Sequence, residues 1–130
     1  PMAEWLYEQG IKGTFAFDVA VVETLSGTEY LAIECNPRYN GSSYPTAIAE
    51  QLEIVAWRSK EIHPQVRKLA DLNWEGLTFD PSTKTGVVLV NWGTIATGKL
   101  SVLVAGNRQQ QSELVDRLER QWSAKPALVS

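Results

Sequence analysis

The sequence predicts an α+β protein in which an antiparallel sheet is flanked by helices. Residues 14–22 and 30–36 alternate bulky apolar side chains with small or polar ones, which is the pattern of two half-buried strands. Residues 86–90 and 100–105 are short apolar runs bounded by glycine, and residues 109–122 carry an apolar stripe at helical spacing. Strands joined by short connections, together with separate helical segments, are typical of this fold class.

Two further helices are predicted in the first half of the chain. Residues 3–9 have the composition of a helix end that Gly10 closes. Residues 45–58 begin with a proline suited to a first helical turn and place their branched apolar side chains on one stripe. That stripe is expected to pack against the apolar face of a neighbouring strand.

The chain of 130 residues can form one compact domain or part of a larger one. Residues 59–64 lose helical periodicity and indicate an internal boundary. We therefore expect residues 1–58 to hold the first strands and helices, and residues 59–130 to hold the closing strands and last helix of the same compact unit. Residues 125–130 are predicted to fray.

The first two strand runs are separated by residues 24–29, a turn signal of hairpin length. Odd positions in both runs are apolar and predict one core-facing side, on which Cys35 is a small buried hydrophobe and not a nucleophile. If the turn is centred near Ser26, opposing residue numbers sum to about 52, which places Asp18 opposite Glu34. Like charges so placed repel each other, and a divalent cation would remove the conflict.

The end of the second run carries three polar groups within five positions. Glu34 and Asn36 are two residues apart, so both point to one face of the strand, roughly 7 Å apart. Arg38 follows Pro37, where the strand has to stop, and its planar guanidinium suits bidentate contact with phosphate or carboxylate. An alternative interpretation is an exposed polar sheet face followed by ordinary Asn-Pro and Asn-Gly turns.

The segments Gly13–Val19 and Tyr30–Arg38 together resemble the C-terminal half of an ATP-grasp domain, and the resemblance covers about residues 1–58. In that family an acidic residue on one strand and a Glu-x-Asn on the next hold magnesium between phosphate oxygens. The resemblance therefore implies ATP and Mg²⁺ or Mn²⁺ as cofactors, with three metal ligands: Asp18, Glu34 and Asn36. Some members carry the first acidic ligand two residues earlier, where this chain has Ala16.

The resemblance also implies roles for the residues after the second strand. Arg38 matches an arginine that contacts phosphate or the acyl-phosphate intermediate, and it is the expected catalytic residue. Residues 39–44 resemble the more variable substrate-side loop of the family. In this loop we expect Asn40 and Ser42 to join Arg38 in binding the cofactor.

The function implied by the resemblance is ATP-dependent ligation of a small-molecule carboxylate to an amine, or occasionally to a thiol, through an acyl-phosphate. A complete enzyme of this family also needs N-terminal lobes that hold the nucleotide. We therefore expect the chain to be a C-terminal fragment, inactive alone, whose partners are those lobes. The alternative is a non-catalytic binding or assembly domain with a degenerate ATP-grasp-like fold. Homo-oligomerisation through exposed strand edges stays open.

Composition argues against several other classes. The formal net charge of −3 argues against a nucleic-acid or membrane surface, because both are recognised by clustered Lys and Arg. No apolar run approaches the roughly 20 residues of a membrane-spanning helix. A single cysteine excludes an intramolecular disulfide, so a reducing cytoplasm is the expected location.

Three other features are predicted to carry no chemistry. Gly93–Lys99 has the spacing of a phosphate-binding P-loop, but Leu100 stands where a Ser or Thr is required, and a strand is predicted to follow in place of a helix. His63 is the only histidine and is predicted to be a loop residue. The five tryptophans are spread singly and are predicted to pack in the core or at its edge.

Overall fold

The computed structural model describes residues 2–123 and confirms the α+β class, with antiparallel sheets and flanking helices. The chain divides into two compact units, residues 1–44 and 45–130, which we call the N-terminal unit and the C-terminal unit. Each unit has its own sheet. The predicted fraying of residues 125–130 falls outside the described residues.

The N-terminal unit begins with helix α1 (Met2–Glu8), as expected. The helix ends in a Schellman motif, because the amide of Gly10 donates to the carbonyl of Tyr7 and the amide of Ile11 donates to that of Leu6. Gly10 has φ +84°, a left-handed conformation that costs glycine little. The predicted helix end at Gly10 is therefore confirmed.

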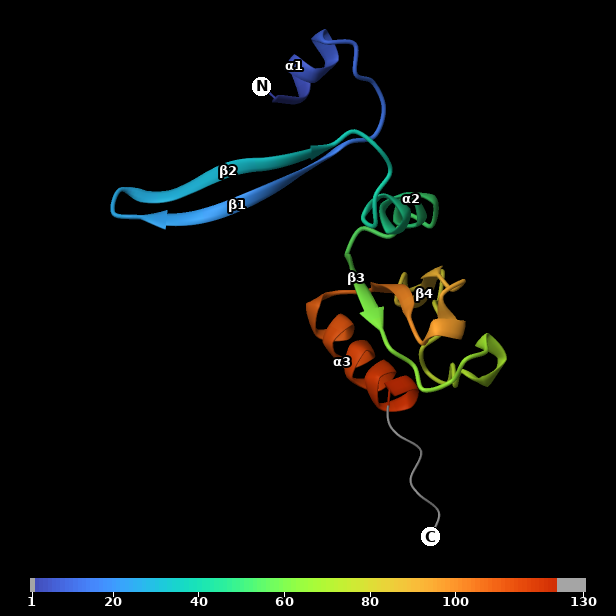
Figure 1. Cartoon of the computed structure of the whole chain (residues 1–130). Coiled ribbons are helices and arrows are strands. Elements are labelled where there is room, and N and C mark those ends of the chain that lie inside the picture. The colour runs from blue at the N-terminus through green and yellow to red at the C-terminus, as the bar shows by residue number, and fades with distance from the viewer. Residues whose placement is uncertain (1, 124–130) are drawn as a thin grey trace. The chain divides into compact units, whose positions relative to one another are not determined.

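Strands β1 (Ala16–Thr24) and β2 (Gly27–Asn36) form an antiparallel two-stranded ribbon (Figure 1). Thr24 pairs with Gly27, so the connecting loop contains only Leu25 and Ser26. The register shifts between Asp18 and Val19, since Asp18 pairs with Glu34 whereas Val19 pairs with Ala32. Ile33 is thus the extra residue of a β-bulge in β2.

The prediction that the odd positions of both strands enter one core is wrong for this ribbon. The bulge reverses the alternation, so that Leu31 lies opposite Ala20 on the even face of β1. The side chains of Val21 and Ile33 are 59% and 71% exposed. Cys35, predicted to be buried, is exposed.

Helix α2 (Ser43–Gln51) is shorter than the predicted helix over residues 45–58. It ends in a second Schellman motif, in which the amide of Glu53 donates to the carbonyl of Glu50 and the amide of Ile54 donates to that of Ala49. Glu53 holds the left-handed position, with φ +56°. Strand β3 (Trp57–Ile62) follows, so the segment predicted as a boundary begins within a strand.

The C-terminal unit contains a three-stranded antiparallel sheet in the order β3-β5-β4, with β4 spanning Gly86–Asn91 and β5 spanning Leu100–Ala105. Helix α3 (Arg108–Leu118) begins with a capping box between Asn107 and Gln110 and continues as a π-helical turn, η3 (Glu119–Ser123). The two predicted strands and the last helix are therefore confirmed. Short 3₁₀ turns occur at η1 (Leu69–Asp71) and η2 (Ile95–Thr97).

The central strand β5 is covered on both faces. Leu100, Val102 and Val104 pack in one cluster with side chains of α3 and with Trp122, while Leu103 and Ala105 pack in a second cluster with Ala49 and Ile54. Figure 1 shows α3 running alongside this sheet. Every residue of β5 except Ser101 is buried.

Two other sequence predictions are confirmed in this unit. The P-loop look-alike Gly93–Lys99 folds as a 3₁₀ turn that leads into strand β5, so no helix follows it. His63 lies in a loop. Trp57, Trp74 and Trp122 pack in the core clusters of this unit, as predicted. Trp92 in this unit and Trp5 in the N-terminal unit are each 58% exposed, which differs from the prediction. No helix within residues 2–123 is long and apolar enough to cross a membrane.

Candidate functional site

The candidate site is the open end of the β1–β2 ribbon, where Asp18 and Glu34 are direct cross-strand partners. Such partners project to the same face, with Cβ atoms about 4.5–5.5 Å apart. Both side chains are exposed, so ordinary rotamer changes bring their carboxylates toward a common point. The predicted pairing of these two residues is confirmed.

The reason for this pairing differs from the one inferred from the turn. With the two-residue loop alone, opposing residue numbers sum to 51, as in the pair Thr24 and Gly27. That register would set Asp18 opposite Ile33 and turn Glu34 to the other face. The bulge at Ile33 adds one residue and brings Glu34 to Asp18. β-Bulges are over-represented beside functional sites, where they re-aim a side chain in this way.

Asn36 supplies the third predicted ligand, two residues beyond Glu34 on the same face. It pairs with Ala16, whose small side chain leaves space above the sheet, and it is half-buried. The chain then turns at Pro37, where the amide of Arg38 donates to the carbonyl of Asn36 at 2.9 Å. This tight turn ends β2 and sets Arg38 immediately beyond the ligand positions.

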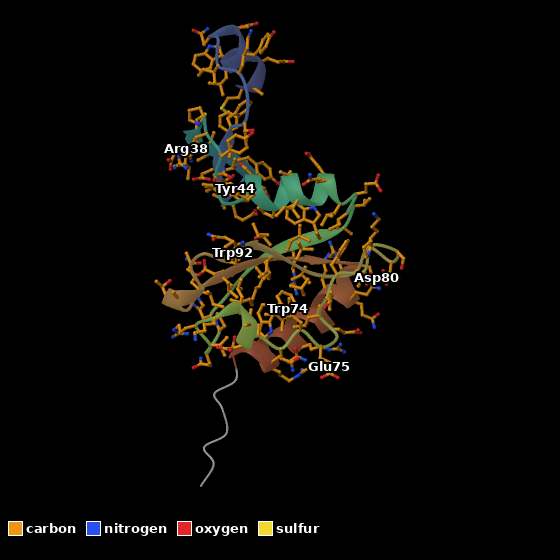
Figure 2. All side chains as sticks on the ribbon, turned by 90° about the vertical axis from the view of Figure 1, so that its right-hand side faces the viewer. Arg38, Tyr44, Trp74, Glu75, Asp80 and Trp92 are labelled. Atoms are coloured by element: carbon orange, nitrogen blue, oxygen red, sulfur yellow. The ribbon has the colours of Figure 1, made fainter. Side chains whose placement is uncertain are left out.

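The Arg38 side chain is exposed, and within residues 2–123 its guanidinium makes one long hydrogen bond, in which Nη1 donates to the Tyr39 carbonyl at 3.4 Å. A guanidinium has five N–H donors, so four besides this one can bind a ligand. Figure 2 labels Arg38 in the loop after β2 and Tyr44 at the start of α2. The guanidinium can therefore meet an anion without first breaking an ion pair.

Asn40 has a structural role that the sequence analysis offered only as an alternative. Its Oδ1 accepts hydrogen bonds from the amide of Ser42 at 2.9 Å and from the amide of Ser43 at 3.2 Å, while its own amide donates to Ser43 Oγ at 3.1 Å. This is a reciprocal cap at the start of α2. The side-chain oxygen of Asn40 is committed to the loop, which leaves its amide nitrogen for a ligand, and Ser42 contributes its backbone amide to the same turn.

Two aromatic residues beside these groups were predicted only as members of the substrate-side loop over residues 39–44, with no individual role. Tyr39 and Tyr44 flank the capped loop, and their ring centroids lie 6.5 Å apart with planes inclined by 32°. The spacing of two tyrosines around an Asn-Gly-Ser-Ser turn was the available signal. It was missed because the loop conformation that brings positions 39 and 44 together cannot be inferred from residue spacing alone.

The donor set of the ribbon suits a hard cation. Two carboxylates and one amide oxygen match the oxygen ligands of Mg²⁺, which commonly takes one or two carboxylates and completes its shell with phosphate oxygens or water. Within residues 2–123 no group of three or more His, Cys, Asp or Glu side chains is placed to hold a metal. Asn36 and a ligand phosphate would therefore have to complete the shell begun by Asp18 and Glu34.

The C-terminal unit carries a separate charged cluster around Glu61. Lys99 Nζ lies 2.7 Å from one oxygen of Glu61 and His63 Nε2 lies 3.2 Å from the other. The pKa of the Glu61 carboxyl lies below its ordinary value, chiefly because Lys99 donates a hydrogen bond to it, with the charges of Lys99 and His63 adding to the effect. This cluster is a solvent-exposed ion-pair network and contains none of the predicted site residues.

Comparisons with known proteins do not assign the chain to a family. No family model matches it, and neither the curated proteins nor the solved structures give a match.

Proposed function

We propose that this chain supplies the metal- and phosphate-binding strands of an ATP-dependent ligase of the ATP-grasp type, which joins a carboxylate to an amine or a thiol through an acyl-phosphate. The observation that carries the proposal is the bulge at Ile33. It sets Glu34 opposite Asp18 in a ribbon whose loop alone would separate them. A like-charge pair held by a special backbone feature is expected where a cation is bound.

Each residue of the site has a defined task in this proposal. Asp18 and Glu34 hold the cation from the two strands, and Asn36 offers its amide oxygen from two residues beyond. Mg²⁺ or Mn²⁺ in this position supplies charge neutralisation for the transferred phosphoryl group of ATP. Arg38 donates to the phosphate and then to the acyl-phosphate, whose charge its planar fork matches. Asn40 and Ser42 hold the loop that follows.

The proposal requires partners. Turnover needs the nucleotide-holding lobes of the parent chain, a carboxylate and an amine, so the chain alone should be inactive. The reaction would take place in the cytoplasm. One observation favours the second candidate, a non-catalytic binding or assembly domain: no family model matches the chain, as expected for a degenerate ATP-grasp-like fold. The sequence encoded upstream of Pro1 separates the candidates, because an enzyme needs the lysines and adenine contacts of a nucleotide lobe there.

The metal assignment is tested by titrating the chain with Mn²⁺ and following paramagnetic broadening of its NMR signals. We expect weak binding, with broadening first at Asp18, Glu34 and Asn36, and loss of this pattern in Glu34→Gln. Glu29→Gln is the matched control, since Glu29 is an exposed carboxylate at the far end of the same strand. Broadening centred on Asp71 or Asp80 would remove the assignment.

The repulsion between Asp18 and Glu34 allows a second test of the site. Opposed like charges cost roughly 0.2–1 kcal/mol, so Asp18→Asn should raise the melting temperature slightly in chelator at low salt. The gain should shrink as added salt screens the pair. Arg38→Gln, made in the parent chain and in the Asp18→Asn variant, controls for pairing of the arginine with Glu34. Destabilisation by Asp18→Asn in both backgrounds would mean that Asp18 has a structural role.

A further inference from the structure

We propose that Tyr39 and Tyr44 form the recognition surface for the carboxylate substrate, and that this substrate is an acid carrying a flat aromatic group. This inference rests on the proposed function, because it adds the substrate carboxylate to the phosphate and acyl-phosphate groups that Arg38 is proposed to contact. It goes beyond that function by naming the class of acid.

The first support is the exposure of the aromatic pair. Tyr39 is 64% exposed and Tyr44 is 59% exposed, although their ring centroids lie only 6.5 Å apart. That separation is within the range of aromatic contact, so the two exposed rings form one continuous aromatic patch. A flat group can therefore lie against both rings at once.

The second support is the rigidity of the loop that carries the rings. Asn40 accepts hydrogen bonds from the amides of Ser42 and Ser43, and Ser43 Oγ accepts from the amide of Asn40. Tyr39 directly precedes this cap and Tyr44 directly follows it. The backbone positions from which the two rings project are thus fixed before a ligand arrives, which lowers the entropic cost of ordering the loop on binding.

The third support is the position of Arg38 beside the pair. Its Nη1 lies 3.4 Å from the carbonyl oxygen of Tyr39, so the guanidinium is close to the backbone of the residue that carries one of the rings. An acid bound there would place its carboxylate at the guanidinium and its remaining atoms toward the tyrosines. An aliphatic acid of one or two carbons has no flat group to lay against the rings, whereas an arylacetic acid has one.

The experiment uses phenylacetate as the probe, with the chain in chelator and without nucleotide, and follows the ring signals of its four tyrosines by NMR. We expect shifts at Tyr39 and Tyr44 but not at Tyr7 or Tyr30. Acetate and phenylacetamide should bind more weakly, because each lacks one half of the recognised group. Arg38→Gln should raise the Kd for phenylacetate by about two- to fivefold.

Matched leucine variants test the rings themselves. Tyr39→Leu and Tyr44→Leu should each raise the Kd for phenylacetate by about two- to tenfold. Tyr30→Leu is the control, since Tyr30 is 72% exposed on β2 and lies outside the loop. An equal effect of Tyr30→Leu, or equal binding of acetate and phenylacetate, would overturn the proposal.

Two outcomes separate this inference from the proposed function. If adenosine shifts the Tyr39 and Tyr44 signals at lower concentration than phenylacetate, the rings recognise a nucleotide base and the substrate class is wrong. If Mn²⁺ fails to broaden Asp18 and Glu34 while phenylacetate binds as expected, the ligase proposal fails and the aromatic-acid site stands. If Mn²⁺ binds as expected while phenylacetate does not bind, the aromatic-acid site fails and the ligase proposal stands.

Discussion

The two units of this chain contain strands of similar composition that differ in how they are covered. In the C-terminal unit Leu100 and Leu103 of β5 are 0% exposed, whereas in the N-terminal unit Val21 of β1 and Ile33 of β2 are 59% and 71% exposed. A sheet with both faces covered gains hydrophobic stabilisation from each strand, and an isolated two-stranded ribbon is marginally stable. The candidate chemistry lies on the weaker element, where bound ligands have the largest influence on order.

The comparison is tested most strongly by truncating one apolar side chain in each unit. Leu103→Ala should cost about 2–5 kcal/mol of unfolding free energy, because it leaves a cavity in a packed core. Ile33→Ala should change stability by less than about 0.5 kcal/mol, because the side chain is largely in solvent. Urea denaturation followed by tryptophan fluorescence measures both. Similar losses of unfolding free energy in the two variants would show that the Ile33 side chain is buried in solution.

The second test uses the two Schellman motifs, which close α1 with glycine and α2 with glutamate. A non-glycine residue in the left-handed position costs about 1 kcal/mol or more, so Glu53→Gly should stabilise the chain by about 1 kcal/mol. Gly10→Ala should destabilise α1 by a similar amount, chiefly by backbone strain, because no atom beyond the adjacent residues lies within 4 Å of the added Cβ.

Loss of the ion pair is the complication in Glu53→Gly. Lys84 Nζ lies 3.4 Å from Glu53, whose side chain is 84% exposed, so this pair contributes little. Glu53→Ala provides the control, because it removes the carboxylate but keeps a Cβ in the left-handed conformation. A gain in Glu53→Ala as large as that in Glu53→Gly would show that the carboxylate, and not the backbone conformation, is the source of the cost.

The hairpin shows how far the sequence allowed the site to be predicted. Alternation predicted the two strands and the Asp18–Glu34 pair, but the pair was inferred from a turn centred on Ser26, whereas it depends on a bulge at Ile33. A bulge leaves no composition signal when the extra residue is itself a good strand former such as isoleucine. The loop shifts the pairing by one residue from the predicted register, and the bulge shifts it back by one, so the Asp18–Glu34 pair was predicted correctly.

Burial was less predictable than register. Alternating apolar residues indicate which side chains share a face, but they do not reveal whether another element covers that face, so Cys35 was placed in a core that the ribbon lacks. The end of α2 was missed for a different reason. The apolar stripe continues through Val55, and the stop signal is a left-handed Glu53, a residue that does not normally mark a helix end.

The smallest expected effect concerns acid sensitivity on the surface of the C-terminal unit, where two carboxyl groups have a lowered pKa for different reasons. Glu61 is affected chiefly by the hydrogen bond from Lys99 and then by the charges of Lys99 and His63, whereas Asp80 accepts hydrogen bonds from the hydroxyl and amide of Ser82. A carboxyl group whose pKa is lower in the folded state adds stability at pH values above its unfolded pKa. That stability is lost as the pH falls through the folded pKa.

Salt distinguishes the two carboxyl groups and completes the test. In concentrated salt the pKa of Glu61 should rise toward its ordinary value of 4.5, because its partners are ions in solvent. The pKa of Asp80 should change less, since a neutral hydroxyl and an amide lower it. Carboxyl chemical shifts recorded between pH 2 and pH 6 at low and high salt measure both groups, and Lys99→Met should reproduce the salt effect at Glu61 alone. Equal salt responses would mean that the Ser82 hydrogen bonds do not control Asp80, and that the net charge of the surrounding surface lowers both pKa values.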